Sequence, residues 1–204
     1  FIVTLHALQC FERGDIRYEV TFMKELPDII TASNYWYWDW YRNGETFIGT
    51  PLKRYYPAWY ETEEDIENWR ALDPENRKNT WILPMSDQTR DPQEYMPGEI
   101  DYEAFVTYSY GGAPCRKFDD SNTGSYSNKT DYRDIHIITL SEVYLIAAEA
   151  YLKAGDEGSA LARLNEVRRR AQLNSATTID VDVVLKERVC ELFGQGSRWI
   201  DLRR

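Results

Sequence analysis

The sequence holds few of the side chains that bind transition metals. Its three cysteines, Cys10, Cys115 and Cys190, are widely separated and form no Cys-x-x-Cys pair, and its two histidines are His6 and His136. A structural zinc site needs about four cysteine or histidine ligands at short, regular spacings. We therefore expect no metal site of this kind and no cofactor, while the odd number of thiols leaves the redox compartment open.

Long apolar runs and an excess of basic residues are also missing. No run reaches the roughly 18 apolar residues that a membrane-spanning helix requires. The formal net charge is −10 and the isoelectric point about 4.8. An acidic chain repels phosphate backbones, so we expect no nucleic-acid partner.

Motifs of common catalytic sites are absent as well. The sequence has no G-x-S-x-G, no P-loop, no G-x-G-x-x-G and no H-E-x-x-H. A glycoside hydrolase with a pair of carboxylates stays open as an alternative, because the separation of two such groups cannot be read from sequence. The absence of the other motifs favours a protein that binds a ligand over one that catalyses a reaction.

Aromatic residues are abundant, with 7 Trp and 15 Tyr, and the segment NYWYWDWYRNGE (34–45) concentrates them. As a helix this segment has no polar side, so we expect a strand or extended loop. In a strand, Trp36, Trp38 and Trp40 share one face. Large rings are most often core, yet flat rings at a surface also stack on the C–H faces of sugars. We expect mostly core packing, with at least one exposed ring.

The first two thirds of the chain are irregular by pattern. FIVTLHAL (1–8) and YEVTFM (18–23) are typical of strands. Acidic residues and spaced apolar groups predict a short helix over 61–72. Residues 73–135 are rich in Pro, Gly, Asp, Asn and Ser and are expected to form turns and loops.

The pattern changes after residue 137, where three amphipathic helices are predicted. The first, within 138–155, has Thr139 and Glu142 as a capping-box candidate and Gly155 after its last turn. Its apolar stripe comprises Leu140, Val143, Tyr144, Ala147, Ala148, Tyr151 and Leu152.

The second and third helices follow within 158–173 and 177–196. We expect Asp182 to cap the third, and Gly194 and Gly196 to stop it. The inward residues are expected to be Ala160, Leu161, Leu164, Val167 and Ala171 in the second helix, and Leu185, Val189, Leu192 and Phe193 in the third. The short connection makes the first two helices an antiparallel hairpin, with residue spacing typical of a tetratricopeptide repeat.

Three ordered blocks of residues occupy about the last third of the chain. They are Glu142, Leu145, Ala148, Glu149 and Ala150; then Asn165, Arg168, Arg170 and Ala171; then Glu187, Arg188, Glu191, Gly194, Gly196, Arg198, Trp199, Asp201, Leu202 and Arg203. Together these blocks resemble the C-terminal signature of SusD/RagB outer-membrane nutrient-binding lipoproteins. Gln195 stands where that family usually has Glu, and Thr139 where Arg is common.

The resemblance implies a mainly α fold, with tetratricopeptide-like helical hairpins, loop-rich segments and a few short strands. We divide the chain into a loop-rich, aromatic-rich, ligand-facing region (1–136) and a helical signature region (137–204). It also implies a lipid-anchored protein on the outer membrane surface, partnered with a SusC-like TonB-dependent transporter. The sequence has no signal peptide or lipidated cysteine at its start, so we expect a fragment whose anchor lies outside it.

The function that this resemblance implies is the non-catalytic capture of glycans for handover to the transporter. The candidate ligand-binding residues are Trp36, Trp38, Trp40, Trp59 and Trp81. A peptide-binding member of the same family, a glycoside hydrolase with aromatic subsites and a helical-repeat scaffold for protein interactions are the alternatives.

Two charged groups of residues have structural interpretations. We expect Glu187, Arg188, Glu191, Arg198 and Asp201 to form a hydrogen-bonded ion network that clamps the last helix. The acidic loop with Asp119, Asp120, Asn122 and Asp131 could hold Ca²⁺ by its oxygen ligands, but a solvated loop is the favoured interpretation.

Overall fold

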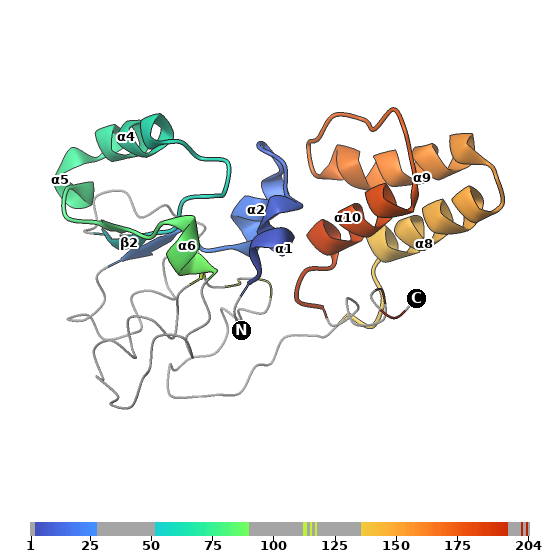
Figure 1. Cartoon of the computed structure of the whole chain (residues 1–204), viewed down its shortest axis with the longest axis horizontal. Helices are drawn as coiled ribbons and strands as arrows, with labels where there is room; N and C mark the ends of the chain where they lie inside the picture. The colour runs from blue at the N-terminus through green and yellow to red at the C-terminus, as the bar shows by residue number, and fades with distance from the viewer. Residues whose placement is uncertain are drawn as a thin grey trace. The chain divides into compact units, whose positions relative to one another are not determined.

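The computed structural model describes residues 3–27, 52–89, 112, 113, 115, 117, 136–195, 201 and 203. The protein is mainly helical, with one small sheet (Figure 1). It divides into two compact units. Unit 1 comprises Phe1–Leu5 and Phe22–Arg133, and unit 2 comprises His6–Thr21 and Asp134–Arg204. Within the described ranges, no helix has the length and hydropathy to cross a membrane.

Unit 1 is built on a three-stranded sheet in the order β1-β2-β3. Strand β1 (Glu25–Pro27) runs antiparallel to β2 (Leu52–Tyr55), and β2 runs parallel to β3 (Trp81–Ile82). The sheet packs with α4 (Glu63–Leu72). The buried members of this core are Leu52, Tyr55 and Trp69, with Ile66 and Ile82 partly buried beside them.

Helix α4 confirms the predicted helix over 61–72. Thr62 caps it, and its hydroxyl and the Asp65 carboxylate form a reciprocal capping box. The side chain of Trp69 stacks on Tyr55 with ring centroids 4.0 Å apart, and its Nε1 donates to Glu25 at 2.6 Å. These contacts tie the helix to both β1 and β2.

Residues 73–89 are more regular than their composition predicts. They contain α5 (Pro74–Arg77), the strand β3 and α6 (Met85–Gln88). Helix α5 is a single turn that begins with Asp73 as its cap and Pro74 at its first position. The turn-forming residues therefore predicted the breaks between these elements correctly. The short helices and the strand between the breaks were not predicted.

The opening segments of the chain are helical, so the strands expected there are wrong. Helix α1 spans Leu5–Gln9 and α2 spans Ile16–Thr21. The β-branched and aromatic residues favour a strand only weakly, and tertiary contacts override that preference. The contacts of α2 include a backbone bond from Ile16 N to Ala171 O at 3.3 Å and the ion pairs of Arg17 described below.

Unit 2 contains the three predicted C-terminal helices, with α8 and α9 as an antiparallel hairpin and α10 against them (Figure 1). They are α8 (Leu140–Lys153), α9 (Glu157–Arg170) and α10 (Val181–Glu191). Their shared core consists of Leu145, Ala148, Leu164 and Val167. The expected inward residues of α9 are buried, apart from the half-buried Leu161.

Helix caps account for where these elements start and stop. Thr139 caps α8 by accepting from Glu142 N, and Gly155 follows the helix at φ +80°, a conformation that suits glycine. Asp180, rather than the expected Asp182, caps α10 by accepting from Val183 N at 2.8 Å. Gly194 has φ +76° beyond α10, and Gly196 lies outside the described residues.

The buried face of α8 differs from the predicted stripe. Leu145 is fully buried in the core, whereas Leu140 is 69 % exposed and Val143 and Tyr151 are also exposed. The helix carries apolar side chains on both sides, so periodicity alone cannot identify which side the rest of the unit covers. The hairpin is confirmed, but the buried face of α8 is rotated by about one residue, roughly 100°, from the predicted stripe. Ala148 belongs to both faces.

Candidate functional site

Of the five tryptophans expected to bind ligand, Trp59 and Trp81 fall within the described residues. Trp36, Trp38 and Trp40, together with the acidic loop over 119–131, lie outside them. Trp59 is 39 % exposed and Trp81 is 38 % exposed, so both rings present area to solvent. Trp69 is buried in the sheet core by comparison.

Trp81 lies beside a cation on the neighbouring strand. The parallel register pairs Arg54 of β2 with Trp81 of β3, and the guanidinium carbon lies 5.7 Å from the ring centroid. Such a cation over an indole face is attracted by the ring quadrupole. Burial raises the pKa of the Tyr56 phenol, and a hydrogen bond and charge from Arg54 oppose that rise. Arg54 is thus held between a buried phenol and an exposed ring.

Trp59 lies in a turn that is stabilised by the carboxylate of Glu61. Glu61 accepts from Lys24 Nζ at 2.6 Å, from the Tyr55 hydroxyl at 3.0 Å and from Ala58 N at 2.8 Å. The Trp59 ring packs edge-on against Tyr60, with centroids 5.6 Å apart and an interplanar angle of 75°. The turn is therefore preorganised, and ligand contact with Trp59 would require little further ordering.

The sequence analysis named these two tryptophans as candidates because they lie near turn-rich segments, and their role in binding stays a prediction. Arg54 was missed, because nothing in the sequence indicates that β2 pairs with β3. Its position could have been found only from the register of the sheet.

The predicted ion network exists in unit 2, where it is larger than the sequence indicated. Arg188 bonds Asp201 through Nε and Nη2, both at 2.9 Å. Glu187 and Glu191 are buried and ion-paired, while Arg198 lies outside the described residues. These pairs join α10 to the segment that follows it, as the clamp hypothesis requires.

Arg17, contributed by α2, is an unpredicted member of the network. Its guanidinium lies 2.7 Å from Asp15, 2.6 Å from Glu187 and 3.3 Å from Glu191. Burial disfavours the charged guanidinium, but the bond to Asp15 and the charges of Glu187 and Asp15 outweigh it and raise the pKa of Arg17. Sequence could not indicate this role, since Arg17 and Glu187 are far apart in the chain.

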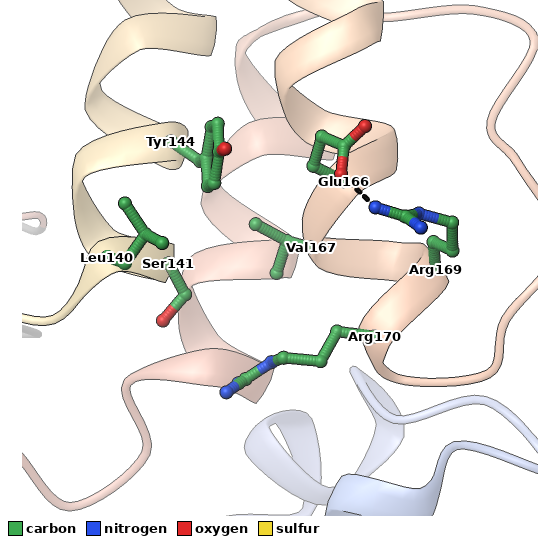
Figure 2. Close-up of a pocket in the computed structure, with 7 residues that line it drawn as sticks. All are labelled: Leu140, Ser141, Tyr144, Glu166, Val167, Arg169 and Arg170. Atoms are coloured by element: carbon green, nitrogen blue, oxygen red, sulfur yellow. Dashed lines mark hydrogen bonds and ion pairs between the residues drawn. The ribbon is translucent and has the colours of Figure 1, made fainter.

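A pocket of about 440 Å³ opens between the start of α8 and the end of α9 (Figure 2). Figure 2 shows Leu140, Ser141 and Tyr144 on the α8 side and Val167 at its centre. Across from them, α9 contributes Glu166, Arg169 and Arg170. The pocket lies entirely within unit 2. Sequence analysis assigned Leu140 and Tyr144 to the core and did not predict a cavity here.

Within the part of the chain that the structure describes, no group of histidine, cysteine and acidic side chains is arranged to hold a metal ion. Cys190 is buried, and burial raises its thiol pKa. The candidate site features among the described residues are rings, guanidinium groups and hydroxyls.

Comparison with known proteins bears on the whole of this chain except its first segment. A SusD-like protein of Bacteroides ovatus is 32 % identical over 104 residues, which cover 47 % of this chain and 19 % of that protein. SusD-like protein P38 of Formosa agariphila is 25 % identical over 173 residues, or 72 % of this chain and 34 % of that protein. The matched part thus spans about a third or less of these relatives. No solved structure matches. The model of the SusD family matches residues 31–204, and the chain belongs to that family.

Proposed function

We propose that this chain is part of a non-catalytic surface protein that binds glycans and hands them to a SusC-like TonB-dependent transporter of the outer membrane. Membership of the SusD family supports nutrient binding in general. The observation that supports a glycan as the ligand is the exposed Trp81 ring with Arg54 over it. An indole offers a flat surface to the C–H face of a sugar, and the guanidinium offers donors to its hydroxyls.

Trp59 and Tyr60 extend the same chemistry to a second place in unit 1. The Trp59 ring is as exposed as Trp81, and its turn is fixed by the bonds of Glu61. Two separate stacking platforms suit an oligosaccharide, because each contact adds modest affinity and release to a transporter remains fast.

Calorimetric titration of the chain with a panel of neutral oligosaccharides tests this proposal. The Trp81→Ala and Trp59→Ala variants are expected to bind about tenfold more weakly, as loss of one ring contact costs roughly 1–2 kcal/mol. Leu72→Ala is the matched control, because Leu72 is an exposed apolar residue of the same unit. Unchanged affinity in both tryptophan variants would remove these rings from the site.

The alternatives give different results in the same samples. Release of new reducing ends would identify a glycoside hydrolase, and binding of peptides in place of glycans would identify a peptide receptor. The transporter and the lipid anchor are tested with the full-length protein in its native membrane. Affinity purification is expected to recover a TonB-dependent barrel, whereas recovery of a soluble complex alone would favour a protein-interaction scaffold.

A further inference from the structure

The pocket between α8 and α9 differs in chemistry from the aromatic platforms of unit 1. Its lining contains two cationic residues, Arg169 and Arg170, and one carboxylate, Glu166. Arg169 pairs with Glu166 and Arg170 pairs with Glu191, so each of the two cations has one carboxylate partner. A guanidinium that keeps unused donors can still bind the carboxylate of a ligand.

Arg170 is held in place at one end of the pocket. Its Nη2 bonds Glu191, which is buried and also receives a hydrogen bond from Ser141 and the charge of Arg17. Burial raises the pKa of Glu191, but these partners outweigh it and hold the pKa below its ordinary value. Figure 2 shows the Arg170 side chain reaching from α9 towards the Ser141 end of α8.

The guanidinium of Arg170 keeps donors for a second partner. Its side chain is 64 % exposed, and Glu191 is its only partner among the residues that the structure describes. A guanidinium has five N–H donors and binds carboxylates through two parallel bonds. One edge can therefore remain on Glu191 while another meets an anionic ligand.

Tyr144 supplies a ring and a hydroxyl on the α8 side. Arg163 lies over its ring at 5.8 Å from the centroid, and the ring packs partly on the core that includes Val167. Across the described ranges, its phenol oxygen makes no hydrogen bond. Leu140, which is largely exposed, adds apolar area beside it. An aromatic ring, an apolar side chain and a free phenol match the mixed surface of a sugar.

The charge of the lining limits the ligand class further. Glu166 lines the pocket and Glu191 lies behind Arg170, so a dianion such as a phosphate monoester meets two carboxylates as well as the arginines. A single carboxylate is compatible with this balance, and sugar hydroxyls can donate to Glu166. A volume of about 440 Å³ is within the range of small-molecule pockets and accommodates a sugar ring.

We propose that this pocket is a second sugar site, selective for a carboxylate-bearing sugar such as a hexuronic acid, with Arg170 on the carboxylate and Tyr144 on the ring. The assignment rests on the proposed glycan function but concerns residues outside the platforms of unit 1. It predicts that the protein distinguishes acidic from neutral glycans through unit 2.

The test compares a galacturonic acid trisaccharide with the neutral galactose trisaccharide by calorimetric titration of the whole chain. Arg170→Gln is expected to weaken binding of the acidic probe by about tenfold to hundredfold, because it removes a charge-assisted hydrogen bond. Lys153→Gln is the matched control. Lys153 is also in the last turn of its helix, is 63 % exposed and pairs with one glutamate at 2.7 Å, but lies outside the pocket. Its variant is expected to bind as the parent does.

Tyr144→Phe gives a second measurement that does not depend on the Glu191 pair. The variant keeps the ring and removes only the hydroxyl, so the fold is retained and the acidic probe is expected to bind a few-fold more weakly. Equal affinity of Arg170→Gln, Tyr144→Phe and Lys153→Gln for the acidic probe would overturn the proposal.

Two further results separate this proposal from the proposed function. Neutral probes that bind through Trp81 while the acidic probe shows no dependence on Arg170 would overturn the second site alone. Absence of binding to every glycan would overturn both. An acidic tripeptide that binds with the same dependence on Arg170 and Tyr144 would show a carboxylate site without sugar selectivity, which also overturns the proposal.

Discussion

The two units use arginine in different environments. In unit 1, Arg54 lies over an exposed indole and Arg77 lies 4.5 Å from the centroid of the buried Trp69 ring. In unit 2, Arg17 and Arg188 are buried among carboxylates. A guanidinium beside an exposed ring leaves a surface for ligand, whereas one enclosed by carboxylates fixes the relative position of helices. The buried arginines of unit 2 therefore fix helices, whereas Arg54 of unit 1 leaves an exposed ring beside it.

The strongest test of this contrast is the removal of Arg17. Arg17→Met leaves Asp15, Glu187 and Glu191 buried with fewer partners, and we expect unit 2 to lose about 3–5 kcal/mol of unfolding free energy. Hydrogen exchange of the α10 amides measures this loss. Arg169→Met is the control, because Arg169 pairs with Glu166 at an exposed position, and stability is expected to stay unchanged. Equal effects of the two substitutions would show that the buried network is not a clamp.

The second test compares the two sides of α8. Leu145→Ala leaves a cavity in the core of unit 2 and is expected to cost about 2–5 kcal/mol, whereas Leu140→Ala changes an exposed side chain and is expected to cost less than about 0.5 kcal/mol. Chemical denaturation of both variants gives the two values. A large loss with Leu140→Ala in this chain would contradict the observed orientation of the hairpin.

A smaller effect distinguishes the two candidate caps of α10. Asp180→Ala removes the acceptor for Val183 N and is expected to destabilise the unit by about 1 kcal/mol. Asp182→Ala removes only a favourable charge from the first turn, with an expected cost of about 0.3 kcal/mol. The midpoints of thermal unfolding rank the two variants, and the reverse order would restore the cap expected from sequence.

Helix existence in unit 2 could be predicted because local signals agree. Apolar spacing, the cap at Thr139 and the glycine at 155 all act within a few residues. The buried side of α8 could not be predicted, since Leu140 and Leu145 are equally apolar and only tertiary packing selects between them.

The parts that sequence misjudged depend on distant contacts. Helix α2 is supported by Arg17, whose partners on α10 are contributed from the other end of the chain. In the same way, Trp81 could be named as a candidate from its type and neighbourhood, but its cation Arg54 is determined by strand pairing. Secondary-structure propensity predicts neither the helix α2 nor the position of Arg54, because both depend on tertiary contacts between distant segments.

The long segment of unit 1, Phe22–Arg133, is a guest segment in the chain, because residues of unit 2, the host, precede and follow it. The host consists of His6–Thr21 and Asp134–Arg204, and the short segment Phe1–Leu5 of unit 1 precedes it. Closing a longer guest segment costs only about 0.6 kcal/mol for each doubling of its length. Extra loops with new rings can therefore enter between residues 22 and 133 while the host keeps its salt-bridged framework, which allows one architecture to acquire new ligands by insertion.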